Sequence, residues 1–433
     1  MKKISALAIA GVFAASFAGT AFAEMADVKV GGEIRVRDEW QNNYSDFNKD
    51  TGDQHNMIVQ RTRVNVDAKV DEKVRAYVSL ENNRNWGSSG PAFSNTAGDS
   101  VGLYQGYVQL DKLFDQPLSF KAGRQKMALG SQRLIGANDW QAGQSFDGWN
   151  LGYSADAFNV NLFALTIADT NSSGTTRDSY LNGLYVTVKS IPMNTLDVYA
   201  IQKEGQNTVL TGTSATASTT VDGASFITYG ARIDGNAMNI DWNAEAAFQS
   251  GDSAKIGTTT VSKSANAFWL RAGYTVPQAA GLRIGAEYDQ LSGNKSTDTD
   301  DKSFDQLYPT KHAISQQYSV YGITDIVEKY IAAAGHPGLQ AFSINASAKP
   351  VEGLKLLAEY WNYSTAEDYA TASGTSKKVG SEVNVQAWYD LSKSTSLHAY
   401  YAQFTPESDF SNGVATGKTD AATDAVLQLQ VAF

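Results

Sequence analysis

The chain ends on Thr423-Asp424-Ala425-Val426-Leu427-Gln428-Leu429-Gln430-Val431-Ala432-Phe433, a stretch in which apolar and polar side chains alternate. In an extended strand, one face of this stretch is apolar and consists of Ala425, Leu427, Leu429, Val431 and Phe433. The opposite face carries Asp424, Gln428 and Gln430. A strand with one apolar face that ends on Phe is typical of the closing strand of a membrane β-barrel. The stretch therefore predicts a barrel embedded in lipid.

The other end of the sequence carries the pattern of an export signal. Met1-Lys2-Lys3 is basic, residues 4–19 are small and apolar, and Ala21-Phe22-Ala23 forms an A-x-A cleavage site. Residues 1–23 are predicted to be a secretory signal peptide, with a retained helical anchor as the alternative. The mature chain, residues 24–433, is expected to form one barrel domain in the bacterial outer membrane. Its sequence has no run of eighteen apolar residues, so it would have to span the membrane with strands.

Segments of alternating polarity recur along the chain and are joined by connections that are alternately short and long. The pattern predicts an all-β fold, a transmembrane antiparallel up-and-down β-barrel with short periplasmic turns and long extracellular loops. A soluble all-β protein is the alternative, but it has no reason to sort its turns into two length classes. About eighteen strands are predicted, an even number as in single-chain bacterial barrels: 28–40, 57–70, 74–84, 101–110, 118–129, 145–153, 158–168, 180–189, 196–204, 226–233, 238–249, 265–276, 282–291, 339–348, 354–363, 382–391, 396–404 and 423–433.

The same alternation sorts charged side chains between lipid and lumen. A charge on the lipid face near the membrane midplane costs roughly 2 to 4 kcal/mol, so an arginine between apolar neighbours is predicted to face the lumen. The arginines assigned to the lumen in this way are Arg35, Arg37, Arg61, Arg63, Arg75, Arg232, Arg271 and Arg283. A lumen rich in arginine favours the passage of anions. The alternative is that these arginines pair with inward carboxylates and only stabilise the wall.

Composition and motifs limit the other function classes. The chain has no Cys, which excludes disulfides and thiolate metal sites, and its net charge of -10 disfavours nucleic acid as a partner. The four histidines, His55, His312, His336 and His398, have no Ser or carboxylate at a recognisable catalytic spacing. We therefore expect no enzyme activity and no cofactor. An outer-membrane hydrolase and a sheath around a redox partner are the rival hypotheses.

Two stretches resemble the alginate-export family of outer-membrane porins. The first is residues 123–140, GRQKMALGSQRLIGANDW, continued by QSFDG at 144–148, and the second is residues 304–312, FDQLYPTKH. The stretch at 322–325 also fits. The resemblance implies an eighteen-stranded barrel, narrowed by inward-folded connections and lined with basic side chains, that passes an anionic polysaccharide without an energy source.

Site residues follow from the resemblance. It adds Arg124 and Arg133 to the basic lumen and assigns Asp139, Trp140, Tyr308 and His312 to the motifs that form the constriction. Gln144 stands where a basic residue is common in the family. Alternation alone would place Arg124 on the lipid face, beside Phe120 and Ala122. A β-bulge at Gly123 would return Arg124 to the lumen, and we predict that bulge.

The longest connection spans residues 292–338. Asp298, Asp300 and Asp301 make its first part acidic, which indicates a solvated loop; Ca²⁺ or lipopolysaccharide bridging is the alternative, and no metal site is predicted. Further along, Thr324 or Asp325 can cap a short helix that ends near Ala334. We expect this helix to fold into the barrel mouth, with packing on the outer rim as the alternative.

Together these patterns predict a passive, anion-preferring outer-membrane porin. The runner-up is a general diffusion porin for small anions and nutrients. The expected partners are outer-membrane lipids, lipopolysaccharide and an anionic solute or polysaccharide, with no nucleic acid. We expect a monomer, and a trimer is the alternative.

Overall fold

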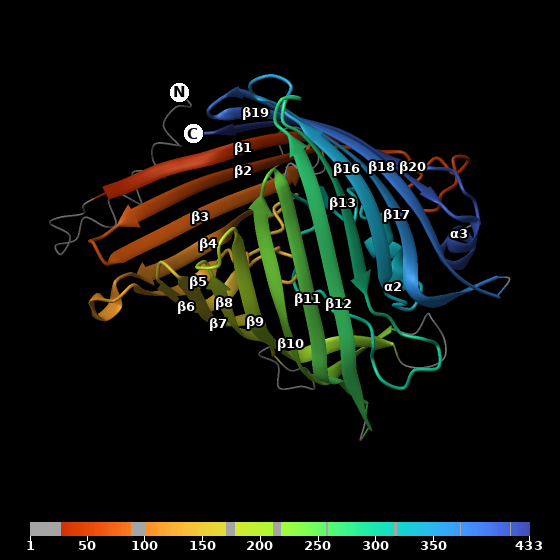
Figure 1. Ribbon diagram of the computed structural model, residues 1–433, viewed down its shortest axis with the longest axis horizontal. Coiled ribbons are helices and arrows are strands. Elements are labelled where there is room, and N and C mark those ends of the chain that lie inside the picture. Colours follow the sequence, from red (N-terminus) through yellow and green to blue (C-terminus); the bar gives the residue numbers. More distant parts are fainter. Residues whose placement is uncertain are drawn as a thin grey trace.

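The computed structural model describes residues 27–87, 100–169, 178–210, 218–256, 259–315, 318–372, 374–415 and 417–433. The predicted signal peptide, residues 1–23, lies outside the described residues. Within them, eighteen strands form one sheet in which neighbours in sequence pair antiparallel (Figure 1). The first strand also pairs with the last, so the sheet closes into a barrel. The predicted fold class and strand number are confirmed.

The first nine strands of the barrel run from the amino-terminal end to the middle of the chain: β1 (Asp27–Asn42), β2 (His55–Lys69), β3 (Val74–Asn85), β4 (Val101–Leu110), β5 (Leu118–Gln125), β6 (Phe146–Ser154), β7 (Phe158–Ala168), β8 (Ser179–Val188) and β9 (Asn194–Leu210). The other nine complete the ring: β10 (Ser218–Ala237), β11 (Ile240–Ile256), β12 (Thr259–Val276), β13 (Leu282–Leu291), β16 (Leu339–Ala348), β17 (Leu354–Thr371), β18 (Gly374–Ser392), β19 (Thr395–Pro406) and β20 (Ala422–Ala432).

The two faces of the barrel differ as the alternation requires. On β13, Arg283 is 2% exposed whereas the next residue, Ile284, is 54% exposed. On β1, Val28, Val30 and Ile34 are exposed on the outer face. Apolar side chains therefore cover the outside, and charged side chains are enclosed.

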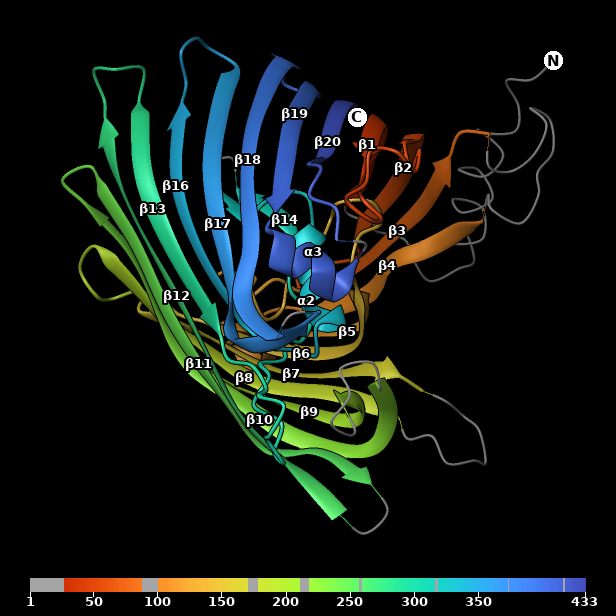
Figure 2. The ribbon, with the colours of Figure 1, turned by 90° about the vertical axis from the view of Figure 1, so that its right-hand side faces the viewer.

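Two connections fold into the barrel and fill much of its interior (Figure 2). The first, residues 126–145, joins β5 to β6. The second, residues 292–338, joins β13 to β16 and contains the hairpin β14 (His312–Ser315) and β15 (Tyr318–Val320) and the helix α2 (Ile326–Ala333). A third insertion, α3 (Ser408–Val414), lies between β19 and β20, and a 3-10 turn, η1 (Leu113–Asp115), lies between β4 and β5. Within the described residues, no helix is long and apolar enough to cross a membrane.

The helix α2 packs inside the ring of strands, so the long connection folds inward. Ile326 and Val327 are fully buried, and the Tyr330 hydroxyl donates to the carbonyls of Tyr44 (3.1 Å) and Ser45 (2.7 Å). Asp325 precedes the helix with a φ of 58°, and its carbonyl accepts the first hydrogen bond, from the Lys329 amide (3.1 Å). An aromatic cluster joins this helix to α3 and to the wall: Phe47, Tyr330, Phe404 and Phe410.

Candidate functional site: lumenal arginines and inward segments

Four arginines enter the lumen from the first hairpin of the barrel: Arg35 and Arg37 on β1, and Arg61 and Arg63 on β2. All four are buried, and the β1–β2 register sets Arg35 directly opposite Arg61. Like charges opposite one another in a sheet destabilise it. The hairpin therefore needs carboxylates or other acceptors close to these guanidinium groups.

Two wall carboxylates supply part of that need. Glu33 on β1 accepts from Arg61 Nη2 (2.6 Å), and Glu81 on β3 accepts from Arg63 Nη2 (2.5 Å). Both carboxylates are on strands, so they are fixed parts of the wall. They also link β1 to β2 and β2 to β3 from the inside.

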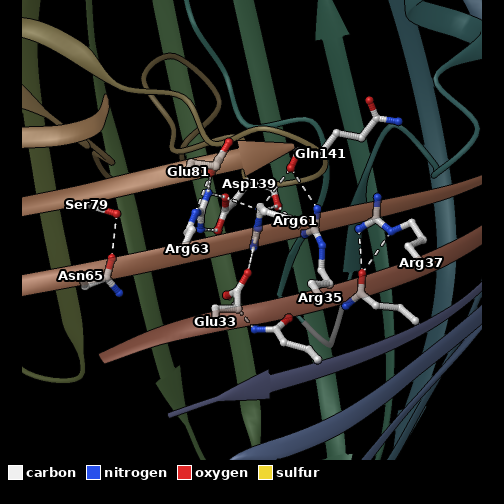
Figure 3. Close-up of polar contacts among 12 residues, drawn as sticks. Glu33, Arg35, Arg37, Arg61, Arg63, Asn65, Ser79, Glu81, Asp139 and Gln141 are labelled. Atoms are coloured by element: carbon white, nitrogen blue, oxygen red, sulfur yellow. Dashed lines mark hydrogen bonds and ion pairs between the residues drawn. The ribbon is translucent and has the colours of Figure 1, made fainter. Parts of the chain in front are cut away.

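A third carboxylate comes from the inward segment 126–145. Asp139 is held by Arg63 through two bonds, Nη1–Oδ2 at 3.0 Å and Nη2–Oδ1 at 2.6 Å, and by Arg61 Nη1 at 2.8 Å (Figure 3). Arg35 donates to the carbonyls of Asp139 (3.1 Å) and Gln141 (3.0 Å). Burial alone would raise the pKa of Asp139, but the bonds and charges of Arg63 and Arg61 outweigh it and the pKa is lowered. Asp139 is therefore anionic at neutral pH.

The next residue, Trp140, is sandwiched between side chains from two distant parts of the chain. The Arg37 guanidinium lies 3.7 Å from the centre of its ring, and the His312 ring stacks on it at 4.1 Å. His312 Nδ1 donates to the Ile323 carbonyl (3.2 Å), and its Nε2 lies 3.0 Å from the Asp325 carboxylate. Trp140 thus joins the β1 wall to the second inward segment.

The two sequence motifs meet inside the barrel. Ile135 and Tyr308 form a parallel bridge, in which the Gly136 amide donates to the Tyr308 carbonyl and the Tyr308 amide donates to the Leu134 carbonyl, both at 2.9 Å. The Gln144 side chain donates to the Gly136 (2.8 Å) and Tyr308 (3.0 Å) carbonyls. The neutral side-chain amide of Gln144 therefore connects the two motifs.

Most other arginines assigned to the lumen form ion pairs there. Their guanidinium–carboxylate distances are 2.6 Å for Arg75–Asp67, 2.6 Å for Arg232–Asp197 and 2.7 Å for Arg283–Asp241. Arg133, in the first inward segment, is 3% exposed and pairs with Glu287 and with Asp289. Arg271 alternates on β12 with the exposed Leu270 and so faces inward. Much of the set of predicted lumenal arginines therefore pairs with carboxylates, as the alternative interpretation expects.

Arg35 and Arg37 differ from the others in their hydrogen-bond partners. Arg37 Nε and Nη2 donate to the side-chain oxygen of Gln428 (3.1 and 2.8 Å), and Arg35 donates only to carbonyls in the bonds described. In these bonds neither guanidinium is held by a carboxylate. This part of β1 therefore places two arginines in the lumen whose bonded acceptors are neutral.

The predicted bulge at Gly123 is wrong. The register runs without a shift from Gly123 to Arg124 against both β4 and β6. Arg124 consequently faces outward and pairs with Asp147 (2.7 Å), their side chains being 37% and 57% exposed, while Gln125 takes the inward position with 1% exposure. The sequence prediction failed because Asp147, on the neighbouring strand, supplies a counter-charge on the outer face.

Two hollows lie beside the contact between the inward segments. One, of ≈ 460 Å³, is lined by Glu39, Trp140, Lys311, His312, Asp325 and Asp424, among others. The other, of ≈ 210 Å³, is lined by Lys126, Asp139, Trp140 and Lys311, among others. Lys311 lines both and lies 3.2 Å from Glu328, whose charge raises the pKa of Lys311. Our sequence prediction missed Lys311, although it lies within the second motif.

The acidic stretch of the second inward segment binds lysines of the chain itself. Asp301 pairs with Lys263 on β12 (2.9 Å), and Asp298 pairs with Lys302 (2.6 Å). Among the described residues, no group of three or more His, Asp or Glu could hold a metal ion.

Comparisons with known proteins agree with this architecture. The alginate export family model matches residues 26–416. Among similar solved structures, Pseudomonas aeruginosa OpdO has 11% sequence identity and a TM-score of 0.61, and the match covers 94% of this chain and 97% of that chain. Pseudomonas aeruginosa OccK8 (OprE) has 14% identity and a TM-score of 0.60, with 94% of this chain and 98% of that chain covered. Acinetobacter baumannii OccAB4 has 12% identity and a TM-score of 0.61, with 95% of this chain and 99% of that chain covered. At these identities the likeness shows the fold alone. No curated protein matches the sequence.

The family match covers nearly the whole described chain, and the solved structures share the closed eighteen-stranded barrel. This is a channel family and not an enzyme family. The chain therefore belongs to the alginate export family of outer-membrane β-barrel channels.

Proposed function

We propose that this channel passes anionic solutes passively across the outer membrane, and that polymers of sugar acids are among its cargo. The observation that carries the proposal is the β1–β2 hairpin, where four buried arginines face the lumen and Arg35 and Arg37 donate to neutral acceptors. A cationic wall lowers the barrier for anions and raises it for cations. Family membership supports an anionic polysaccharide as the cargo.

Reversal potentials in planar bilayers under a salt gradient test the selectivity. Wild-type protein is expected to prefer anions, and replacing Arg35 and Arg37 by Gln together should lower the anion-to-cation permeability ratio several-fold, since a unit charge near the path contributes on the order of 1 kcal/mol. Lys49→Gln, on an outer loop with its side chain 68% exposed, is the control for the loss of a positive charge outside the lumen. Cation preference of the wild type would refute the proposal.

A second candidate is a general porin for small anions and nutrients. The hollows of ≈ 460 and ≈ 210 Å³, both lined by Trp140, favour it, because spaces of that size suit one small solute each. Current block by uronate oligomers separates the two functions. Block by oligomers at millimolar concentration supports the polymer, and block by monomeric uronate alone supports the small-solute porin.

We further propose that the channel is a monomer and that residues 1–23 are removed on export. A single chain closes its own barrel and fills its lumen with its own segments, so no second chain is needed to complete the path. Light scattering of the detergent-solubilised protein measures the mass, and a threefold value would show the trimer. Amino-terminal sequencing of the exported protein should begin at Glu24.

A further inference from the structure

The contact between Asp139 and the β2 arginines has the geometry of a bound carboxylate ligand. Two oxygens of one carboxylate face Arg63, and one of them also accepts from Arg61 (Figure 3). Paired, charge-assisted bonds of this kind are how arginine recognises planar carboxylates. The carboxylate, however, belongs to the inward segment and not to the wall.

The charges of the groups bonded to one another in this contact balance only when Asp139 is present. Arg35, Arg61 and Arg63 bring three positive charges, and the wall carboxylates Glu33 and Glu81 bring two negative ones, which leaves one positive charge. Asp139 neutralises it. If Asp139 left, any other carboxylate would restore the balance.

Exposure shows from which side the arginines can be reached. The Arg61 and Arg63 side chains are 2% and 8% exposed, and those of Glu33 and Glu81 are 15% and 10% exposed. The Asp139 side chain is 34% exposed. Asp139 therefore faces the open lumen, and a solute can approach the guanidinium groups by taking its place.

We propose that Arg61 and Arg63 form a binding site for the carboxylate of a passing solute, and that Asp139 occupies this site as an internal ligand until the solute displaces it. The proposal rests on the proposed function and names the site at which that function selects uronates. Exchange of one carboxylate for another keeps the number of charged bonds constant. A neutral sugar offers no carboxylate and cannot make the exchange.

The displaced segment would stay close to the wall. Arg35 still holds the Gln141 carbonyl, and Trp140 remains between Arg37 and His312. Asp139 can then return after the solute has left. Asp139 therefore competes reversibly with the solute carboxylate for Arg61 and Arg63.

The test compares block of ion current by galacturonate in the wild type and in Asp139→Asn, using full-length protein in planar bilayers. If the arginine site is free of Asp139 about a tenth of the time in the wild type, Asp139→Asn should lower the galacturonate concentration that gives half-maximal block about tenfold. Asp67→Asn is the matched control, since it also removes one negative charge, pairs with Arg75 and is 30% exposed. It should change the half-blocking concentration by less than about twofold. An unchanged or higher value in Asp139→Asn would overturn the proposal.

A second measurement covers the case in which Asp139→Asn does not fold. Trp140 keeps its place between Arg37 and His312, but displacement moves the carboxylate of the adjacent residue and so changes the charge near the indole. Galacturonate should therefore change the tryptophan emission of the wild type, and Trp140→Phe should abolish that change. Galactose should have no effect. No response of Trp140 to galacturonate would overturn the inference. Reversal potentials from the same membranes report separately on the proposed anion preference, so either idea can fail while the other holds.

Discussion

Gly123 shows how one missing side chain permits a close contact between strands. Its φ is +123°, and an added Cβ would lie 2.3 Å from the Gly106 carbonyl oxygen and 2.9 Å from Tyr107 Cα. Gly123→Ala should destabilise the barrel by about 1–3 kcal/mol through strain and overlap. The check is the temperature at which the folded band converts to the unfolded band in gel electrophoresis. Gly102→Ala, whose Cβ has its nearest neighbour at 3.9 Å, should leave that temperature unchanged, and equal behaviour of both variants would contradict this view.

The pKa of Asp139 predicts how the inward segment responds to acid. Because Arg63 and Arg61 lower this pKa below its ordinary value near 3.8, the contact is fully present above that value and is lost as the pH falls through the folded-state pKa. Trp140 also contacts His312 and lines a hollow with Asp424, so the readout is the difference between the wild type and Asp139→Asn. The emission change that Asp139→Asn removes should lie below about pH 4. If the variant instead removes a transition near neutral pH, the arginines do not control Asp139.

The sequence could predict the orientation of some side chains but not the partners of others. Arg35 and Arg61 could be assigned to the inner face because their neighbours alternate in polarity. Arg124 follows the same rule, and the prediction failed only when the family motif was allowed to override it. The pairing of Asp139 with Arg63 could not be predicted from spacing, because 76 residues separate the two.

The alternation of polar and apolar residues located every strand of the barrel wall but not the ends of the strands, and it missed the short inner strands β14 and β15. β10 begins at Ser218 rather than Phe226, and β17 runs to Thr371 rather than Tyr363, because these hairpins continue as paired strands through polar stretches that look like loops. β5 stops early, at Gln125, where the chain turns into the lumen. No pattern in the sequence predicted α3, which has only seven residues and no side-chain cap.

The docking of α2 should be separable from the stability of the barrel. Ile326, the first residue of α2, is fully buried. Ile326→Ala should therefore weaken the packing of α2 against the barrel interior by about 2–4 kcal/mol, because the smaller side chain leaves a cavity. The wall keeps all its strand pairing, so the gel transition should move little while residues 292–338 become easier to cleave with protease. Lys329→Ala, on the exposed side of α2, is the control. Equal cleavage of Ile326→Ala and the wild type would show that α2 is not held by this contact.

In the whole molecule, the lumen contains the buried side chains that stabilise the barrel and is also the route that a solute would take. The chain has a net charge of -10, yet arginines gather inside, where carboxylates of the wall and of the inward segments neutralise most of them. In the proposed function, anion preference depends on the few arginines that have no bonded carboxylate. The sequence could predict the inward arginines but not which of them lack such a partner, because the partners come from distant segments.

Closure of the barrel depends on a seam between β1 and β20, and Gly32 is its tightest point. Gly32 and Phe433 exchange backbone hydrogen bonds of 2.8 and 3.1 Å, and a Cβ on Gly32 would lie 2.6 Å from the Phe433 ring and 2.5 Å from the Arg63 carbonyl oxygen. Gly32→Val should therefore push the terminal ring off the seam and lower the folded fraction on refolding into detergent micelles, scored by gel migration. Gly102→Val, in open surroundings, should refold like the wild type. If Gly32→Val refolds as well as that control, barrel closure does not need the contact between Gly32 and the Phe433 ring. The backbone pairing of β20 with β19 and β1 would then be enough to hold the carboxyl-terminal strand.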